Sequence, residues 1–428
     1  MKKLTYSTAM LLLMGSTATT TVYAENFNGQ LSIKPSLDVT AGIFYSDKSY
    51  NNPAADDHVA WQEAYAKYGL TADYKFQNSA LYASLQGLSS GTFGDGDSGG
   101  MTDGTERKTS LEEWVLGWRT GGNTDPKIDF SLGRQNVQIA DGFLVAGDAL
   151  NAGNGIAEGE LNRGGGYYLA ARKSFDFTSV LHYQLTDALK THWYYLESDN
   201  KAQYEPTLWA TDWQYNLGST DLGFTYLGIL DIKDPLKESV REDLKDIAMR
   251  GKVQLTEQLG FNAEYVYQDQ KNTHENAWYA ALNYTFDQVP YQPTLGYRFS
   301  SFSEDYDPLF YGNTDAGFGT WFQGEVAANY AGPYSTNTRI HQISLQASVK
   351  ENLHLGLLAY QFDTIKKDNE NLDGHELDLF GIWSPTNHIN VIPVLGFYKP
   401  KKDITQGGTQ VNGTDTNTYA QLLLQYVY

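Results

Sequence analysis

Apolar and polar side chains alternate one by one along several long stretches of the chain. In the segment QLSIKPSLDVTAGIFY, residues 30–45, Leu31 and Ile33 fall on one parity and Lys34 and Asp38 on the other. Alternation with a period of two residues predicts a β-strand with one apolar and one polar face. The stretch is about twice as long as a typical globular strand, and long enough to cross a bilayer at a tilt.

The same alternation recurs through the rest of the chain, in segments 111–119, 246–256, 339–349 and 418–428. Each has an apolar and a polar parity, and the last ends in the aromatic residue Tyr428. A final strand that ends in an aromatic residue resembles the C-terminal signal of bacterial outer-membrane proteins. These features favour a transmembrane barrel over a β-sandwich.

Short and long connections between the expected strands alternate along the chain. Long connections rich in glycine and acidic or amide residues, typical of the external loops of outer-membrane barrels, separate short turns typical of the periplasmic side. Eight short turns, with both termini on the periplasmic side, predict 18 strands, with 16 as the alternative. The expected short turns are at 76–79, 121–126, 184–189, 217–221, 256–259, 287–293, 350–353 and 384–388.

The fold class that this pattern predicts is all-β, a transmembrane antiparallel β-barrel. Inside hydrocarbon every backbone N–H and C=O group must be paired within the protein, so a sheet can cross a bilayer only as a closed ring. A ring of 16 to 18 strands is wide enough to leave an aqueous lumen unless loops fold into it. The polar parity would then line this lumen.

The beginning of the chain has the features of an export signal. Lys2 and Lys3 precede a short apolar core, and small residues precede a cleavage position after Ala24. We therefore expect residues 1–24 to be a cleaved signal peptide and 25–428 to be a single outer-membrane β-barrel domain. No apolar run is long enough for a membrane-spanning helix, and the absence of cysteine excludes disulfides and thiolate metal sites.

Composition is consistent with this fold but does not decide it. The chain has 31 Tyr, 19 Phe, 9 Trp and 41 Gly, which suits the aromatic girdles and turns of a barrel. A secreted, β-rich carbohydrate-binding enzyme would show the same enrichment. Without Lys2 and Lys3 the chain has 29 basic and 51 acidic residues, a net charge of −22. We expect this charge mostly in the external loops, where it could bind divalent cations shared with lipopolysaccharide or favour cations at the pore mouth.

Enzymatic chemistry has little support in the sequence. There is no HExxH or GxSxG motif, and the Gly-rich runs lack the context of a phosphate-binding loop. Glu112 and Glu113 are adjacent along an expected strand, so they should point to opposite faces. His182 and His192 lie symmetrically about a turn and could form a metal or pH-sensing pair, or simply two lumen-lining imidazoles. We predict no catalytic residue, metal site, cofactor or nucleic-acid partner.

Charged residues on the polar parities are the candidates for the wall of the solute path. A lumen with both signs of charge would orient polar solutes and offer guanidinium groups to carboxylates, although the same charges could merely solvate a wide pore. The basic candidates on polar parities are Lys67, Arg119, Arg250, Lys252 and Arg298, and the acidic ones are Glu63, Asp73, Glu113 and Asp129. Arg134 and Arg163, in or at the edge of the long segment 134–173, are also candidates for the solute path.

The segment SEDYDPLFYGNTDAGFGTWFQGE, residues 303–325, contains five carboxylates and six aromatic side chains. It falls in an expected external loop, and so many aromatic residues are unusual for a solvated loop. We expect it to fold against the barrel rim or into the lumen and to act as a gate or constriction. The residues expected to form this gate are Asp307, Phe310, Tyr311, Trp321, Gln323 and Glu325.

Two blocks of sequence, 132–150 and 305–330, the second followed by 339–362, resemble the alginate export family of outer-membrane proteins. The resemblance implies an 18-stranded monomeric barrel, whose best-known member passes an anionic uronate polymer through a constriction rich in arginine and lysine. It also implies that Arg134 and Gln135 lie beside the pore mouth. In the external loop it places Asp307, Leu309, Phe310, Tyr311, Gly312, Trp321, Gln323 and Glu325.

The function predicted from these features is a porin-like channel in the bacterial outer membrane for passive passage of hydrophilic solutes. The solute could be an oligosaccharide, a polysaccharide or an organic acid. The alternatives are a non-selective general diffusion porin and a barrel that serves only as the platform of an enzyme or adhesin. Expected partners are outer-membrane lipid, lipopolysaccharide and the solute, and the protein is expected to be a monomer.

Overall fold

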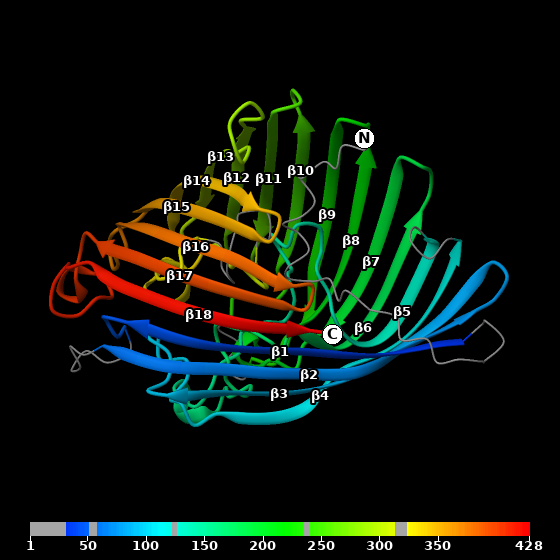
Figure 1. The fold of residues 1–428 in the computed structure, drawn as a ribbon, viewed down its shortest axis with the longest axis horizontal. Coiled ribbons are helices and arrows are strands. Elements are labelled where there is room, and N and C mark those ends of the chain that lie inside the picture. Colours follow the sequence, from blue (N-terminus) through cyan, green and yellow to red (C-terminus); the bar gives the residue numbers. More distant parts are fainter. Residues whose placement is uncertain (1–30, 51–57, 122–125, 235–238, 313–322) are drawn as a thin grey trace.

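The computed structural model describes residues 31–50, 58–121, 126–234, 239–312 and 323–428. The expected signal peptide, residues 1–24, therefore lies outside the described residues, as does Trp321 of the expected gate. Nearly all regular structure in the described part is β-strand, and its few helical turns are very short (Figure 1).

Eighteen antiparallel strands form one closed sheet (Figure 1). Each strand pairs with its neighbours in sequence, and β1 pairs with both β2 and β18, so the predicted 18-stranded barrel is confirmed. The strands are β1 (Leu31–Ser46), β2 (Val59–Lys75), β3 (Ser79–Gly94), β4 (Arg107–Gly121), β5 (Pro126–Asn136), β6 (Ser174–Gln184), β7 (Leu189–Glu197), β8 (Thr207–Asn216), β9 (Thr220–Asp231), β10 (Lys245–Gln254), β11 (Leu259–Asp269), β12 (His274–Thr285), β13 (Thr294–Phe302), β14 (Thr338–Lys350), β15 (Leu353–Thr364), β16 (Gly374–Thr386), β17 (Ile389–Pro400) and β18 (Asn417–Val427).

Within the described ranges, short helical turns occur only in the connections. They are η2 (Ala157–Gly159), η3 (Lys201–Gln203), η5 (Ala327–Ala331) and η6 (Ile404–Gln406). Of these, η5 is a single π-helical turn and the others are 3₁₀ turns. No helix among the described residues has the length and apolar character needed to cross a bilayer.

The eight predicted short turns all lie at junctions between consecutive strands, at one end of the barrel, although the predicted turn 384–388 overlaps the last three residues of β16. We call this the short-turn end, and the opposite end the long-loop end. Connections at the long-loop end are mostly longer, the largest being 137–173 and 303–337, although β11 and β12 are joined there by residues 270–273 alone. The first described strand begins, and the last strand ends, at the short-turn end.

The alternation read from the sequence divides the wall into two faces. In β1, Ile33 and Ile43 are exposed on the outside, while Thr40, Phe44 and Ser46 point inward and are buried. The closing strand follows the same rule, with Leu422, Leu424 and Tyr426 outside and Tyr419 and Gln421 inside. Large exposed apolar side chains occur on the outer face of nearly every strand, so the outside of the barrel is an apolar belt.

Substitution of a belt residue by arginine tests whether the outer face contacts the hydrocarbon core of the bilayer. Leu116 lies on the outside of β4 with 60% of its surface exposed. We expect Leu116→Arg to lower the free energy of unfolding in phospholipid bilayers by about 2–4 kcal/mol, the cost of a charge facing lipid near mid-depth. A denaturant titration of the protein folded into vesicles measures this loss.

The control is Ile404→Arg, the same kind of exchange at an exposed position of η6, outside the strands. It should change stability by no more than about 0.5 kcal/mol. Equal effects of the two substitutions would contradict contact between this belt and lipid.

Candidate functional site: two paired loops inside the barrel

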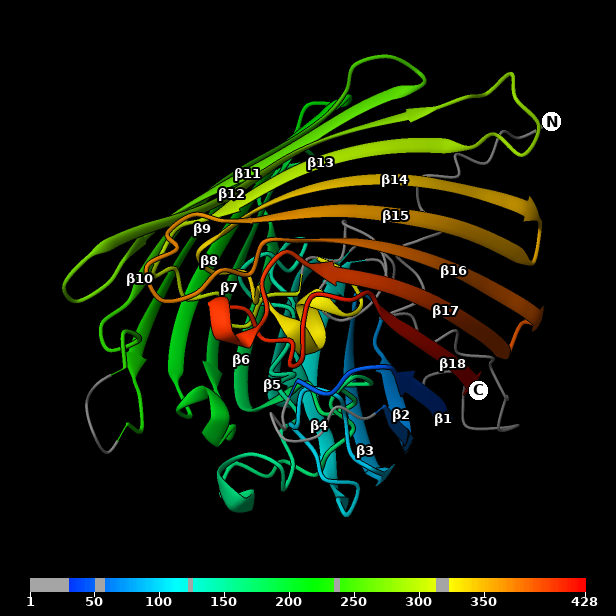
Figure 2. The ribbon, with the colours of Figure 1, turned by 90° about the vertical axis from the view of Figure 1, so that its left-hand side faces the viewer.

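Two long connections fold back into the barrel from the long-loop end. The β5–β6 connection, residues 137–173, buries Phe143, Val145 and Tyr168, and the β13–β14 connection, residues 303–337, buries the whole of η5. Figure 2 shows η5, in yellow, inside the ring of strands. The described residues of the expected gate therefore lie within the barrel.

The two inserted loops are paired with each other through their backbones. Val145 and Phe310 form a parallel β-bridge. Ala146 N donates to Phe310 O at 2.8 Å, Phe310 N donates to Leu144 O at 3.2 Å, and Gly312 N donates to Gly142 O at 3.0 Å. These bonds satisfy backbone groups that would otherwise be left without a partner inside the barrel. The loops thus form one unit within the lumen.

Aromatic side chains pack this unit against the wall. The ring of Phe143 lies 5.2 Å from that of Tyr279 on β12 and 5.5 Å from that of Tyr311 on the second loop. The ring of Phe310 contacts that of Phe175 on β6 at 5.0 Å. Contacts of this kind contribute about 0.5–1.5 kcal/mol each beyond the burial of their area. They explain why a loop so rich in aromatic residues is not solvated.

A buried ion pair fixes the start of the second loop. Arg241, in the β9–β10 connection, donates from Nε to Asp307 Oδ2 at 2.6 Å and from Nη2 to Asp307 Oδ1 at 2.8 Å. A third donor of Arg241, Nη1, reaches Gln203 Oε1 at 2.6 Å. Burial alone would raise the pKa of Asp307, but the guanidinium outweighs it and holds the pKa below its usual value. The fork-shaped contact ties three separate loops together.

The end of the second loop rests on carboxylates of the wall. Glu376 on β16 accepts hydrogen bonds from Val326 N at 2.6 Å and Ala327 N at 2.9 Å, and Asp378 accepts one from Glu325 N at 3.2 Å. Tyr168, from the first loop, donates to Glu325 Oε2 at 2.7 Å. Burial raises the pKa of Glu325 to about 8, with the nearby Glu376 adding to the shift. The carboxyl of Glu325 is therefore mostly protonated at neutral pH.

Glu63 holds the first loop in the same way, as an acceptor for its backbone N–H groups. It lies on the inner face of β2, fully buried, and accepts hydrogen bonds from Tyr168 N at 3.2 Å and Leu169 N at 2.9 Å. The sequence placed Glu63 on the pore wall. It does point inward, but it is covered by the loop that it holds, so it does not face open solution.

Most other predicted wall charges point into the lumen and are paired there. Arg119 forms an ion pair with Asp73, and its guanidinium lies 4.9 Å from the centre of the Tyr82 ring. Tyr82 in turn donates to Asp129 at 2.5 Å. Among the described strands, these inward groups gather toward the short-turn end. The wall there is polar but not dominated by one sign of charge.

A second group of predicted residues lies on strands β10 and β13. Arg250 pairs with Asp212 on β8 at 2.6 Å, and the Arg298 guanidinium lies 3.6 Å from the ring centre of Tyr279. Lys252 shares the inward parity of Arg250 and is exposed. On the other side of the barrel, Lys67 lies opposite Asp38 in the β1–β2 register.

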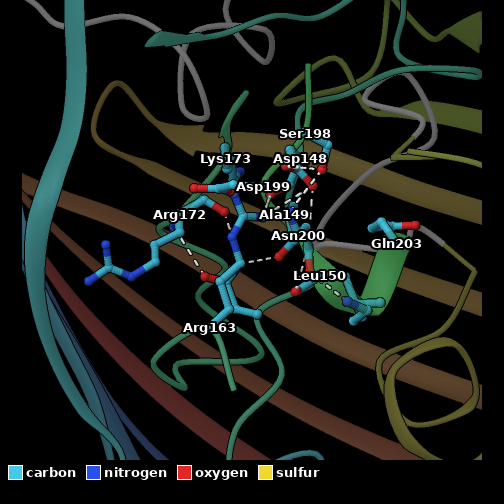
Figure 3. A network of polar contacts seen from close by, with 12 residues as sticks. Asp148, Ala149, Leu150, Arg163, Arg172, Lys173, Ser198, Asp199, Asn200 and Gln203 are labelled. Carbon is cyan, nitrogen blue, oxygen red and sulfur yellow. Dashed lines mark hydrogen bonds and ion pairs between the residues drawn. The ribbon is translucent and has the colours of Figure 1, made fainter. Parts of the chain in front are cut away.

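Arg134 and Arg163 lie where the sequence placed them, at the edge of the segment 134–173 and within it: Arg134 is near the end of β5 and Arg163 is in the β5–β6 connection. Figure 3 shows the polar network around Arg163. Arg134 is in register with the outward-facing Trp114, next to an irregularity in the β5–β6 pairing between Gly133 and Gln135. Arg163 is buried beneath the long loops, 3.1 Å from Asp148 Oδ1. Asp199 bridges the two arginines at 2.8 and 3.0 Å. Both therefore serve the outer rim and the loops rather than the lumen.

Glu112 and Glu113 do not point to opposite faces as predicted. The β3–β4 register shifts at Gln86 and Gly87, so that Glu113 pairs with Gln86 and the next pair is Leu111 with Gly87. This bulge leaves Glu112 buried, accepting from Lys173 N at 2.9 Å, while Glu113 accepts from Ser84 Oγ on the inner face. A bulge adds one residue to one strand, and alternation alone does not reveal it.

His182 and His192 do face each other across the β6–β7 hairpin, as their spacing suggested. Their ring centres are 4.6 Å apart. Among the described residues, no group of three or more His, Asp or Glu side chains is arranged to hold a metal ion.

Sequence reasoning missed Arg241, Glu376 and Asp378. Glu376 and Asp378 occupy the polar parity of β16, so their inward direction could be read from the alternation. Their hydrogen bonds to a loop about 50 residues away in the chain could not. Arg241 lies in a long acidic connection and gives no local signal of a partner at Asp307.

Comparison with known proteins supports the fold. No family model and no curated protein matches this chain, so the resemblance to the alginate export family gains no support. Solved structures of outer-membrane porins match it over nearly its whole length. OpdQ of Pseudomonas aeruginosa aligns with a TM-score of 0.61 and 11% identity, over 92% of this chain and 97% of that chain.

Two further structures give the same picture. OccK8 (OprE) of Pseudomonas aeruginosa has a TM-score of 0.61 and 11% identity, over 92% of this chain and 98% of that chain. OccAB3 of Acinetobacter baumannii has a TM-score of 0.59 and 10% identity, over 92% and 99%. At this identity the likeness establishes the fold and not the solute.

Breaking the buried ion pair should loosen the second loop. Asp307→Ala leaves the Arg241 charge buried without its partner, so we expect the docking of residues 303–312 to weaken by about 3–5 kcal/mol. Hydrogen exchange of the backbone amides in this segment measures the change. Arg241→Ala should have a similar effect, and the double variant should lose little more than either single one.

The matched control is Glu304→Ala in the same loop. It removes an ion pair with Lys366 that is about half exposed, and should cost less than about 1 kcal/mol. If this substitution accelerated exchange as much as Asp307→Ala, the ion pair of Asp307 would not be what holds the loop.

The cluster of Glu325, Glu376 and Asp378 should make the docking of η5 against the wall sensitive to alkaline pH. The raised pKa of Glu325 means that the docked loop favours the neutral carboxyl, so this contribution is complete at low pH and is lost as pH rises through about 8. Glu325 faces Glu376, Asp378 and Tyr168. Hydrogen exchange of residues 326–331, corrected for the intrinsic rate, should show weaker protection at pH 9 than at pH 6.

Glu325→Gln should flatten this pH dependence, because the amide does not ionise. Asp307→Asn is the comparison, since the lowered pKa of Asp307 makes its contribution disappear only in acid. An unchanged alkaline response in Glu325→Gln would contradict this assignment.

Proposed function

We propose that this protein is a non-enzymatic channel in the bacterial outer membrane through which small hydrophilic solutes pass passively. The observation that carries the proposal is the pair of long loops joined to each other inside a closed 18-strand barrel. A barrel of this size is otherwise wide enough for an aqueous channel. Loops fixed inside it would set the size of what passes.

The outer face and the ends of the barrel support the membrane location. Exposed apolar side chains surround the wall, and a closed sheet leaves no unpaired strand edge in hydrocarbon. Turns at one end are short, as on the periplasmic side of such barrels, and the connections at the other end are mostly long. The export signal expected at residues 1–24 agrees with this location, and lipopolysaccharide would then surround the long-loop end.

The lumen charges favour a small polar solute over a polyanion. Arg119 and Arg250 each lie beside a carboxylate, Asp73 and Asp212, so the wall carries both signs at close range. Such a wall can bind the hydroxyl groups of an oligosaccharide or the carboxylate of an organic acid as hydration water is removed. An alginate-like polymer would need a stronger excess of positive charge than this wall offers.

Shortening the second loop tests the channel and its constriction together. The wild-type protein reconstituted in planar bilayers should conduct ions. Replacing residues 304–336 with a short turn should raise the single-channel conductance at least twofold. The control variant shortens residues 286–293 at the opposite end and should leave conductance unchanged.

The other outcomes are equally informative. Absence of ion conductance in the wild-type protein would refute the channel. Conductance that the loop deletion leaves unaltered would refute the constriction. A current that neither oligosaccharides nor organic acids reduce would favour the second candidate, a non-selective diffusion porin.

A further inference from the structure

The barrel wall is incomplete between β4 and β5 near the long-loop end. Residues 107–111 and Glu113 of β4 pair with β3, but the first β4–β5 pair is Trp114 with Arg134. Above that point the free edge of β4 is covered by the β5–β6 loop instead of by a strand. Arg172 Nη2 donates to Lys108 O at 3.0 Å, and the Glu112 carboxylate accepts from Lys173 N and Ser174 N.

A pocket of about 450 Å³ lies at this break in the wall. Its lining joins parts of the chain that are far apart in sequence, and it combines polar with apolar groups. Five of its lining side chains are basic, Lys108, Arg134, Arg163, Arg172 and Lys201, and three are acidic, Glu160, Asp176 and Asp199. A positive excess is notable in a chain with a net charge of −20.

The two lysines differ from the arginines in their partners. Arg134 and Arg163 are joined to Asp176 and Asp199, so these carboxylates are largely compensated. Lys108 and Lys201 are both exposed, and neither has a carboxylate within ion-pair distance in the described part of the chain. Their charges are therefore available to a ligand.

The same pocket has an apolar side. Leu111 and Trp114 line it and also belong to the outward-facing belt, with 45% and 39% of their surfaces exposed. The ring of Trp114 lies 6.4 Å from that of Phe177 on β6, which extends the apolar surface along the outside of the wall. A ligand in this pocket thus contacts cationic side chains on one side and the apolar surface of Leu111 and Trp114 on the other.

We propose that the pocket binds the phosphorylated sugar head group of an outer-leaflet glycolipid, whose acyl chains lie along Leu111 and Trp114. Guanidinium and ammonium groups together suit a phosphate monoester, which carries up to two negative charges. A free anion would use the cations alone and leave the apolar side unused. A glycolipid would occupy both the cationic and the apolar side of the pocket. This assignment rests on the proposed membrane location.

Binding of a bisphosphorylated glycolipid to the full-length protein in detergent tests the proposal. Native mass spectrometry should detect the bound lipid and show weaker binding of the same lipid after dephosphorylation. The double variant Lys108→Gln, Lys201→Gln should bind roughly tenfold or more weakly, since each cation near an anionic lipid surface contributes to affinity. Neither lysine holds the fold through an ion pair, so this variant should still fold.

The control is Lys75→Gln with Lys350→Gln, which removes two exposed lysines next to turns at the short-turn end. An equal loss in this control would overturn the proposal, because it would show attraction by overall charge only. Inorganic phosphate or a soluble sugar phosphate that binds as tightly as the lipid would overturn the lipid assignment.

The binding measurement does not depend on conduction. Lipid binding without conductance would refute only the channel, and conductance without lipid binding would refute only this pocket.

Discussion

Closure of the sheet is the constraint on which the other features depend. Because β1 pairs with β18, the ladder has no free edge over most of its height, and the polar parity of every strand is turned toward a common interior. That interior then becomes the place where long connections can be buried. Where such a loop packs against the wall or against another loop, its buried backbone groups need partners within the protein.

The two inserted loops meet this requirement in two ways. They pair with each other at Val145 and Phe310, and they use carboxylates of the wall as acceptors for their backbone N–H groups. Glu63 accepts hydrogen bonds from the first loop, and Glu376 accepts them from the second. An acidic side chain buried inside the barrel is therefore not in itself a sign of a path for cations. Several of the carboxylates that make this chain acidic are structural acceptors.

Much of the fold could be predicted from the sequence because it follows from a local rule. Alternation fixes the face of each residue, and turn composition fixes where strands end, so the eight short turns and the 18 strands were predictable. Predictions failed where one extra residue breaks the period. A bulge beside Glu112 brings it to the inside. Arg134 keeps the parity of the outward-facing Phe130 and Leu132, so its place on the outer side follows from the alternation itself. The inward position of segment 303–312 was suggested by its aromatic content, but its partners Arg241 and Val145 depend on contacts between distant loops.

The pairing of Val145 with Phe310 has a mechanical consequence. The first loop is rooted between β5 and β6 and the second between β13 and β14, which lie almost opposite each other in the ring. Joined at Val145 and Phe310, the loops act as a strut across the ring. A ring of strands is easily flattened into an ellipse by lateral pressure, and a strut along a diameter resists that deformation. The cross-section of the lumen is then held by an internal brace as well as by the wall.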